Sequence, residues 1–197
     1  MKTISRAVVF ILLLNQCLLA GTKKEIKIAL KNNDPKEIQT KQQLERLLKN
    51  YDLSKWIFTT DIVIDKDAIP HSHPILTLHT RHLKDDELLL STFVHEQIHW
   101  FITQNEKQTE AAVNELKILF PKVPVGYPDG AEDEYGSYIH FIVNYLEYRS
   151  DKELLGELKA RQIMEFWSTD HYRWIYRQML ENEGKIRGIV FKNKLII

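Results

Sequence analysis

Hydrophobic and polar positions alternate with the periods of helices and strands along most of the chain. Asp34 and Glu37 flank a proline as an N-cap and a capping-box glutamate, which predicts a helix over 35–50. Residues 56–64 are rich in β-branched and aromatic side chains, and residues 75–80 alternate between apolar and polar. These two segments are therefore predicted to be strands.

The second half of the chain shows only helical patterns. An acidic first turn followed by an apolar run predicts a helix over 85–104, and a more polar helix over 106–119 is stopped by the prolines that follow it. A further helix is expected over about 133–151. Asp170 is a candidate N-cap for the remaining helix, which is expected to reach about residue 183. Mostly helix with a small sheet indicates an α+β fold.

The first twenty residues have the pattern of a targeting signal. Lys2 and Arg6 precede an apolar stretch that ends near Ala20 and is short for a membrane span. This predicts a signal peptide over 1–20 and an extracytoplasmic protein, periplasmic or secreted, with an uncleaved anchor as the alternative. Cys17 is the only cysteine, so the remaining chain would fold without disulfides.

Composition and charge exclude some classes of protein. Of 197 residues, 27 are basic and 27 acidic, and 44% are hydrophobic, which is typical of a globular protein. Balanced charge argues against a dedicated nucleic-acid-binding protein, because such proteins carry a basic excess. Residues 21–197 show no linker or repeat and are expected to form a single domain.

The strongest chemical signal is the pattern H-E-x-x-H at residues 95–99, inside the most apolar predicted helix. His95 and His99 are four residues apart, so both rings lie on one helix face and can reach one metal ion. Glu96 follows the first histidine and can accept a proton from a water molecule at the metal. The alternative is a hydrogen-bonded pair of core histidines, but burying such groups without partners is costly.

A third ligand must come from elsewhere, and the helix over 133–151 offers a polar stripe. His140, Asn144, Glu147 and Asp151 fall on one face of this helix among apolar neighbours. Such a stripe is either the solvent face of the helix or one wall of a polar site. His140 and Glu147 are both candidate ligands, and Glu134 is a more distant one.

The two motifs together resemble the gluzincin branch of the zincin metallopeptidases. The match is H-E-x-x-H at 95–99 with E-x-x-x-D at 147–151. The resemblance implies that His95, His99 and Glu147 bind zinc, whereas His140, on the same stripe, is the alternative third ligand. It also implies that Glu96 is the general base and acid, and that Asp151 orients a histidine ligand from behind. Leu146 departs from the family pattern, which has asparagine there.

The same resemblance implies a zincin-like domain in which the edge strand of the sheet, here 75–80, lines the active-site cleft and pairs with an extended peptide. Hydrolysis also needs a donor to the developing oxyanion, for which His171 and Tyr172 are the candidates. Other tyrosines that could serve are Tyr135, Tyr138 and Tyr176. The alternative for these aromatic residues is packing on a terminal helix.

We therefore expect an exported zinc metallopeptidase (a hydrolase with a Zn²⁺ cofactor) that acts on peptide or protein substrates. One alternative is a non-catalytic extracytoplasmic metal-binding protein, which a fourth protein ligand would favour. Another is a zinc amidase that acts on cell-wall material. No stable membrane span is expected once the signal peptide is removed.

Overall fold

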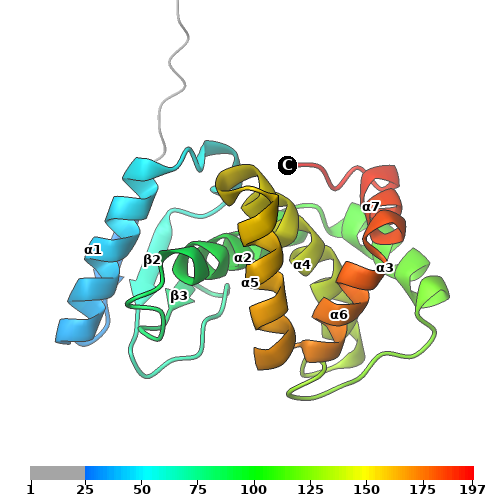
Figure 1. The fold of residues 1–197 in the computed structure, drawn as a ribbon, viewed down its shortest axis with the longest axis horizontal. Coiled ribbons are helices and arrows are strands. Elements are labelled where there is room, and N and C mark those ends of the chain that lie inside the picture. The colour runs from blue at the N-terminus through cyan, green and yellow to red at the C-terminus, as the bar shows by residue number, and fades with distance from the viewer. Residues whose placement is uncertain (1–24) are drawn as a thin grey trace, which may run out of the picture.

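The computed structural model describes residues 25–197, which form an α+β fold as predicted (Figure 1). α1 and the strands lie on one side of the molecule, the later helices lie on the other, and α2 runs between them. The elements in chain order are β1 (Lys27–Leu30), α1 (Pro35–Asn50), the 3₁₀ helix η1 (Ser54–Trp56), β2 (Asp61–Ile64), β3 (Leu76–Leu78), α2 (Asp86–Gln104), α3 (Glu106–Leu119), α4 (Glu134–Leu155), α5 (Glu157–Asp170), α6 (Arg173–Glu181) and α7 (Glu183–Lys192).

The sheet is small and entirely parallel, in the order β1-β2-β3. Ile62 and Leu76 lie opposite each other in its register, as do Ile64 and Leu78, and all four are buried. The intervening Val63 is on the more exposed face. Because side chains alternate across a strand, one face of the sheet joins the core and the other remains partly open.

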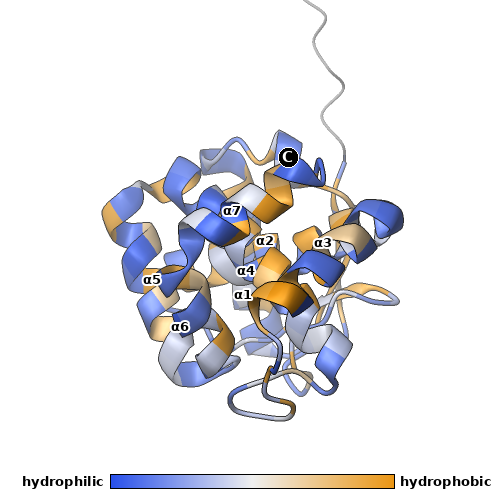
Figure 2. Ribbon diagram, turned by 90° about the vertical axis from the view of Figure 1, so that its right-hand side faces the viewer, coloured by the Kyte–Doolittle hydropathy of each residue, from blue (hydrophilic) through white to orange (hydrophobic). Residues whose placement is uncertain are grey.

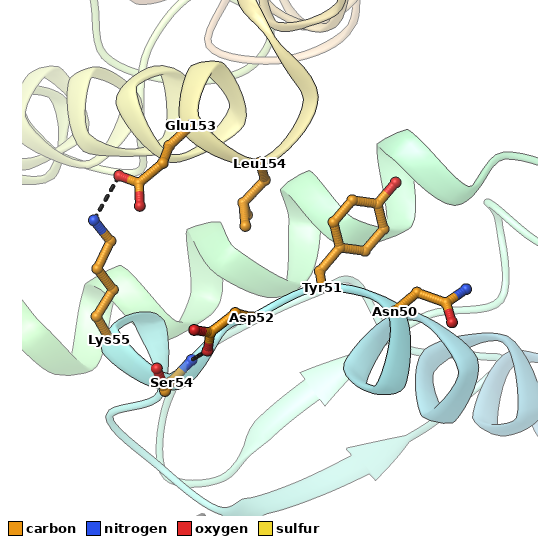
Figure 3. A pocket seen from close by; sticks show the side chains of 7 residues that line it. All are labelled: Asn50, Tyr51, Asp52, Ser54, Lys55, Glu153 and Leu154. Atoms are coloured by element: carbon orange, nitrogen blue, oxygen red, sulfur yellow. Dashed lines mark hydrogen bonds and ion pairs between the residues drawn. The ribbon is translucent and has the colours of Figure 1, made fainter.

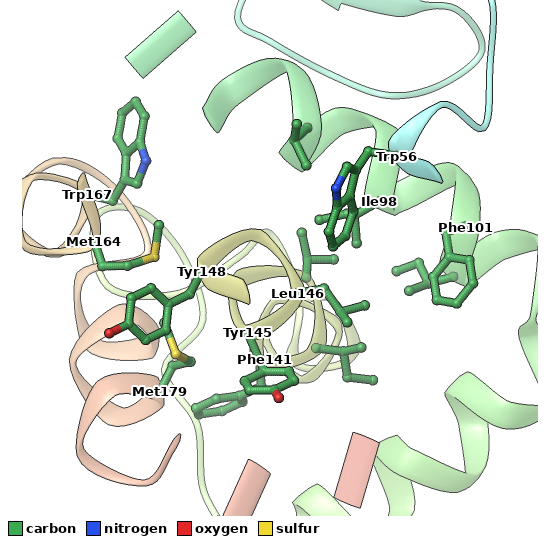
Figure 4. Close-up of a cluster of buried hydrophobic side chains, with 14 of the residues drawn as sticks. Trp56, Ile98, Phe101, Phe141, Tyr145, Leu146, Tyr148, Met164, Trp167 and Met179 are labelled. Atoms are coloured by element: carbon green, nitrogen blue, oxygen red, sulfur yellow. The ribbon is translucent and has the colours of Figure 1, made fainter. Parts of the chain in front are cut away.

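α4 is the central helix of the core. It packs against α2, α3, α5, α6 and α7, and Figure 4 shows large side chains around it, with Tyr148 and Met164 on one side and Ile98 on the other. One cluster of buried hydrophobic residues extends from Leu44 to Leu195. Figure 2 shows hydrophilic and hydrophobic residues interspersed along α5, α6 and α7, as expected of helices with one buried side.

The strand predicted over 56–64 is only partly present. β2 begins at Asp61, and η1 occupies the start of the predicted segment. The cause is a buried side chain of α2: the amide oxygen of Gln97 accepts hydrogen bonds from the backbone N–H groups of Phe58 and Thr59 at 2.7 and 2.9 Å. These backbone groups are thereby satisfied outside a sheet. β1 was not expected from the sequence.

The region around Asp170 also differs from the prediction. α5 ends at Asp170, and the next helix, α6, begins only at Arg173. The Asp170 carboxylate therefore caps no helix; it pairs with the Arg81 guanidinium and accepts a hydrogen bond from Nδ1 of His171. Tyr172, between the two helices, has a φ of 47°, in the left-handed region that is uncommon for large side chains.

The predicted signal peptide over 1–20, and with it the predicted extracytoplasmic location, lies outside the described residues. Within 25–197, no helix combines the length and the apolar character that crossing a membrane would require.

Candidate metal centre

The candidate site lies where two polar stripes meet between α2 and α4. On α2 the stripe consists of Ser91, His95 and His99, which are spaced one helical turn apart. On α4 it consists of the predicted residues, His140, Asn144, Glu147 and Asp151, all of them buried. The stripe on α4 is therefore the wall of an interior site and not a solvent face.

Three histidines converge at one end of this seam. His95, His99 and His140 each offer one ring nitrogen, and the three atoms lie within 4.8 Å of one another. The Nε2 atoms of His95 and His99 are 3.3 Å apart. His140 uses its Nδ1 to donate to the backbone oxygen of Gly136 at 2.7 Å, which leaves Nε2 as its free ligand atom. This group could hold a metal ion.

A metal site requires neutral imidazoles, and burial favours the neutral form in two of the three rings. Burial lowers the pKa of His140 to about 3 and that of His99 well below its usual value. Burial also acts on His95, but the Glu147 carboxylate outweighs it and raises the pKa of His95 overall. The hydrogen bond to Glu147 places a proton on Nδ1 of His95, and the Nε2 of this ring is within hydrogen-bond distance of Nε2 of His99. A metal ion between the two rings would take the place of the proton shared in this contact.

Glu147, the predicted third ligand, is not part of the metal-binding group. The structure brings the alternative, His140, to the two histidines of α2. Glu147 lies behind His95, where its Oε2 accepts a hydrogen bond from Nδ1 at 2.9 Å. A ligating imidazole commonly donates its second N–H to a carboxylate. Glu147 thus takes the orienting position that the family resemblance implied for Asp151.

A buried hydrogen-bond network surrounds Glu147. Its carboxylate also accepts from the hydroxyl of Ser91 at 2.6 Å and from that of Tyr176 at 2.8 Å. Asp151 lies one turn further along α4, with its Oδ2 3.0 Å from the same Ser91 oxygen. Burial and the nearby Glu147 charge raise the pKa of Asp151 well above its usual range. Trp167 completes the network by donating its indole N–H to Ser91 at 3.2 Å.

Ser91 and Trp167 were not among the residues singled out from the sequence. Ser91 lies one turn before His95 on the same face of α2, so the spacing of the motif could have indicated it. Trp167 comes from α5, and no local pattern connects it with the motif. Tyr176, a candidate oxyanion donor, instead donates its hydroxyl to Glu147.

Glu96 is buried beside the histidine group. Burial raises the pKa of its carboxyl group to about 7. Among the described residues, no hydrogen bond reaches this carboxylate, although the charges of His95 and His71 act on it. A carboxyl group with this pKa and no hydrogen-bond partner is suited to exchange protons with a water molecule near neutral pH.

The two predicted oxyanion donors lie next to the histidines. The ring of Tyr172 is 3.9 Å from that of His140, measured between centroids. Burial, with contributions from the charges of Glu96 and Glu132, raises the pKa of Tyr172 to about 12, so its hydroxyl keeps its proton. His171 contacts Tyr172 edge-on, but its Nδ1 is engaged by Asp170. Tyr138 binds a backbone oxygen in the core, away from this group.

The predicted peptide-binding edge is already paired. β3 is the edge strand, as expected, but the backbone N–H and C=O of Thr77 both bond to His71, at 2.8 and 3.1 Å. The chain after His71 is held against α2, because Trp100 donates its indole N–H to the oxygen of Ser72 and stacks on the ring of His73. An extended peptide therefore cannot add to β3 at Thr77 while this segment is in place.

Two surface hollows lie outside the group formed by His95, His99 and His140, although His71 lines the second of them. A hollow of about 300 Å³ lies between the end of α1, η1 and α4, and Figure 3 shows the Lys55–Glu153 ion pair at its side. Another, of about 280 Å³, lies beside the open face of the sheet near Val63 and Pro74. Neither is lined by a residue of the metal-binding group.

Comparison with known proteins adds no assignment to this site. No protein-family model matches the chain, and no curated protein or solved structure matches it at a significant level. The candidate site consequently stands on the chemistry of its own residues: three convergent imidazoles, a carboxylate behind one of them, and a second carboxylate of raised pKa beside them.

Proposed function

We propose that the chain is a zinc-dependent hydrolase that cleaves peptide bonds. The observation that carries this proposal is the convergence of His95, His99 and His140 directly beside Glu96. Three protein ligands that leave one position for water are typical of catalytic zinc sites, whereas structural sites use four. Among the described residues, the group that could hold an ion contains these three and no fourth member.

Zinc fits the donor set. Neutral imidazoles suit zinc, whereas calcium and magnesium prefer oxygen ligands. Ligands of a tetrahedral ion at zinc–nitrogen distances of 2.0–2.1 Å are separated from one another by roughly 3.3–3.4 Å. The Nε2 atoms of His95 and His99 are 3.3 Å apart, so these two need no rearrangement to share one ion.

A bound zinc ion would polarise the scissile carbonyl group and lower the pKa of a coordinated water molecule to about 7. The protein would supply the proton transfers: Glu96 accepts a proton from the attacking water and returns it to the leaving amine. Tyr172 keeps its proton at neutral pH and donates a hydrogen bond to the developing oxyanion, with His171 as the alternative donor. The exported location predicted from the sequence would place the substrates outside the cytoplasm.

The test is metal content together with hydrolysis. We expect the purified protein to bind about one equivalent of zinc and to cleave members of a peptide library. Glu96→Gln should retain the zinc and lose hydrolysis by about 10²- to 10⁴-fold, because only the proton carrier is removed. Zinc below a tenth of an equivalent after zinc-replete expression would contradict the metal site, and an active Glu96→Gln variant would remove Glu96 from the mechanism.

A second candidate is a non-catalytic metal-binding protein, and the observation that favours it is burial. Only 6% of His95, 6% of Glu96 and 7% of His140 is exposed. Zinc binding with no cleavage of any peptide would support this candidate. Release of products from muropeptides, but not from peptides, would instead support the cell-wall amidase.

A further inference from the structure

Ser91 lies at the centre of the network behind His95, and its hydrogen bonds cannot all be made by its own proton. Its oxygen is 2.6 Å from Glu147, 3.0 Å from Asp151 and 3.2 Å from the Trp167 indole nitrogen. A serine hydroxyl has one proton to donate and can accept two. Trp167 can only donate, so the two carboxyl groups compete for a single serine proton.

The distances decide which carboxyl group receives that proton. A separation of 2.6 Å is typical of a hydroxyl that donates to a charged carboxylate. Glu147 also accepts from His95 and Tyr176, so three donors stabilise it as an anion. Asp151 is fully buried, and among residues 25–197 its one hydrogen bond is with Ser91 and its Oδ1 has no partner. A bare buried carboxylate with one contact would be very costly.

We propose that Asp151 is a neutral carboxylic acid that donates to Ser91, and that Asp151, Ser91 and Tyr176 are positioning residues that hold the Glu147 carboxylate against His95. The chain of donors then runs from Asp151 to Ser91 to Glu147, and every member has a partner. Trp167 fills the remaining acceptor position of Ser91.

The consequence for the metal centre acts through His95. The Glu147 anion, held by two hydroxyl groups and by Nδ1–H, keeps the His95 ring oriented and its Nε2 lone pair available. The role of the network in metal binding rests on the proposed zinc site, whereas the protonation of Asp151 can be tested without any metal.

The direct test is infrared difference spectroscopy at neutral pH on the metal-free protein. The spectrum of the parent minus that of Asp151→Asn should contain the carbonyl stretch of a protonated carboxylic acid. The spectrum of the parent minus that of Glu147→Gln should contain carboxylate bands and no such stretch. Carboxylate bands in the Asp151 difference spectrum would overturn the proposal. Both substitutions preserve the size and shape of the side chain that they replace.

The second measurement is zinc affinity by chelator competition. Asp151→Ala should weaken zinc binding about tenfold, and Asp151→Asn should recover most of that loss, because an amide N–H replaces the acid O–H as the donor to Ser91. Glu147→Gln should remain about 10- to 100-fold weaker, because an amide does not replace an anion. The proposal would be overturned if Glu147→Gln bound zinc as tightly as Asp151→Asn, or if Asp151→Asn bound zinc no more tightly than Asp151→Ala. Absence of zinc from the parent protein would contradict the proposed function, while the infrared result would still decide the state of Asp151.

Discussion

The residues at the two ends of the polar stripe on α4, His140 and the pair Glu147 and Asp151, lie on the same helix face but make different contacts with His95 and its neighbours. His140 joins His95 and His99 in the group that could hold a metal ion, whereas Glu147 accepts a hydrogen bond from Nδ1 of His95 and Asp151 bonds to Ser91 behind it. The ring of His95 separates the two ends. In the proposed zinc site, a side chain on this helix face would act as a ligand or as an orienting group according to which nitrogen of His95 it meets.

The largest expected effect on zinc affinity comes from replacing His140, the proposed ligand on α4. His140→Ala should weaken zinc binding by more than about 100-fold, beyond the range for residues that only orient a ligand. The measurement is the zinc dissociation constant by chelator competition. His171→Ala is the matched control, because this histidine lies next to Tyr172 but outside the group of three, and its affinity should stay within about threefold of the parent.

The outcome of that comparison also tests the assignment of Glu147. If Glu147→Gln lost more affinity than His140→Ala, the two ends of the stripe would have exchanged roles. Such a result would restore the ligand set implied by the family resemblance, with Glu147 completing the coordination.

A smaller effect on zinc affinity is expected from removing a hydrogen-bond donor to Glu147. Tyr176→Phe removes one of the three donors to Glu147 and should weaken zinc binding about tenfold. Tyr138→Phe removes another buried tyrosine hydroxyl, which donates to the backbone oxygen of Phe120 at 2.7 Å. Each substitution should lower the free energy of unfolding by about 1–2 kcal/mol.

Zinc titration and denaturant unfolding of both variants separate the two contributions. Only Tyr176→Phe should change the zinc dissociation constant. If Tyr138→Phe weakened zinc binding equally, the effect at Tyr176 would be one of general stability and not of the position of Glu147.

The smallest effect is expected on stability and away from the histidines of the site, at the ion pair between the half-exposed Arg81 and the less exposed Asp170. The hydrogen bond from Arg81 contributes most to lowering the pKa of Asp170, from its usual 3.8 to about 2, and His171 adds to it. A lowered pKa in the folded state stabilises the protein above pH 4, and this stabilisation disappears as the pH falls towards 2. Because half of the Arg81 side chain is exposed, we expect Asp170→Asn to lose only about 1 kcal/mol.

Urea unfolding of the parent and of Asp170→Asn between pH 2 and pH 7 measures this difference. The two curves of stability against pH should converge at the acidic end and run parallel above pH 4. A difference that persisted unchanged at pH 2 would show that packing, and not the carboxylate charge, is responsible.

The sequence was sufficient to predict the part of the site that comes from one continuous segment, α2. The motif at 95–99 is contiguous, and its helical setting follows from the apolar residues around it, so His95, Glu96 and His99 could be placed on one element. Which residue of α4 completes the group depends on how α4 is rotated about its axis against α2. Local spacing contains no such information, and both His140 and Glu147 satisfy it.

The fold shows the same division between local and tertiary signals. The start of α1 follows from its capping box, which the structure contains. The late start of β2 at Asp61 depends on Gln97, about forty positions away in the sequence, whose amide satisfies the backbone of Phe58 and Thr59. Propensity over 56–60 favoured a strand, and a tertiary hydrogen bond overrode it.

X-ray absorption spectroscopy at the zinc edge of the zinc-loaded protein tests the central claim most directly. Multiple scattering from imidazole rings distinguishes histidine ligands from carboxylate oxygens. The account predicts three imidazoles from His95, His99 and His140, with one further light-atom ligand, and the loss of one imidazole in His140→Ala. Two imidazoles with a protein carboxylate, unchanged in His140→Ala, would contradict it.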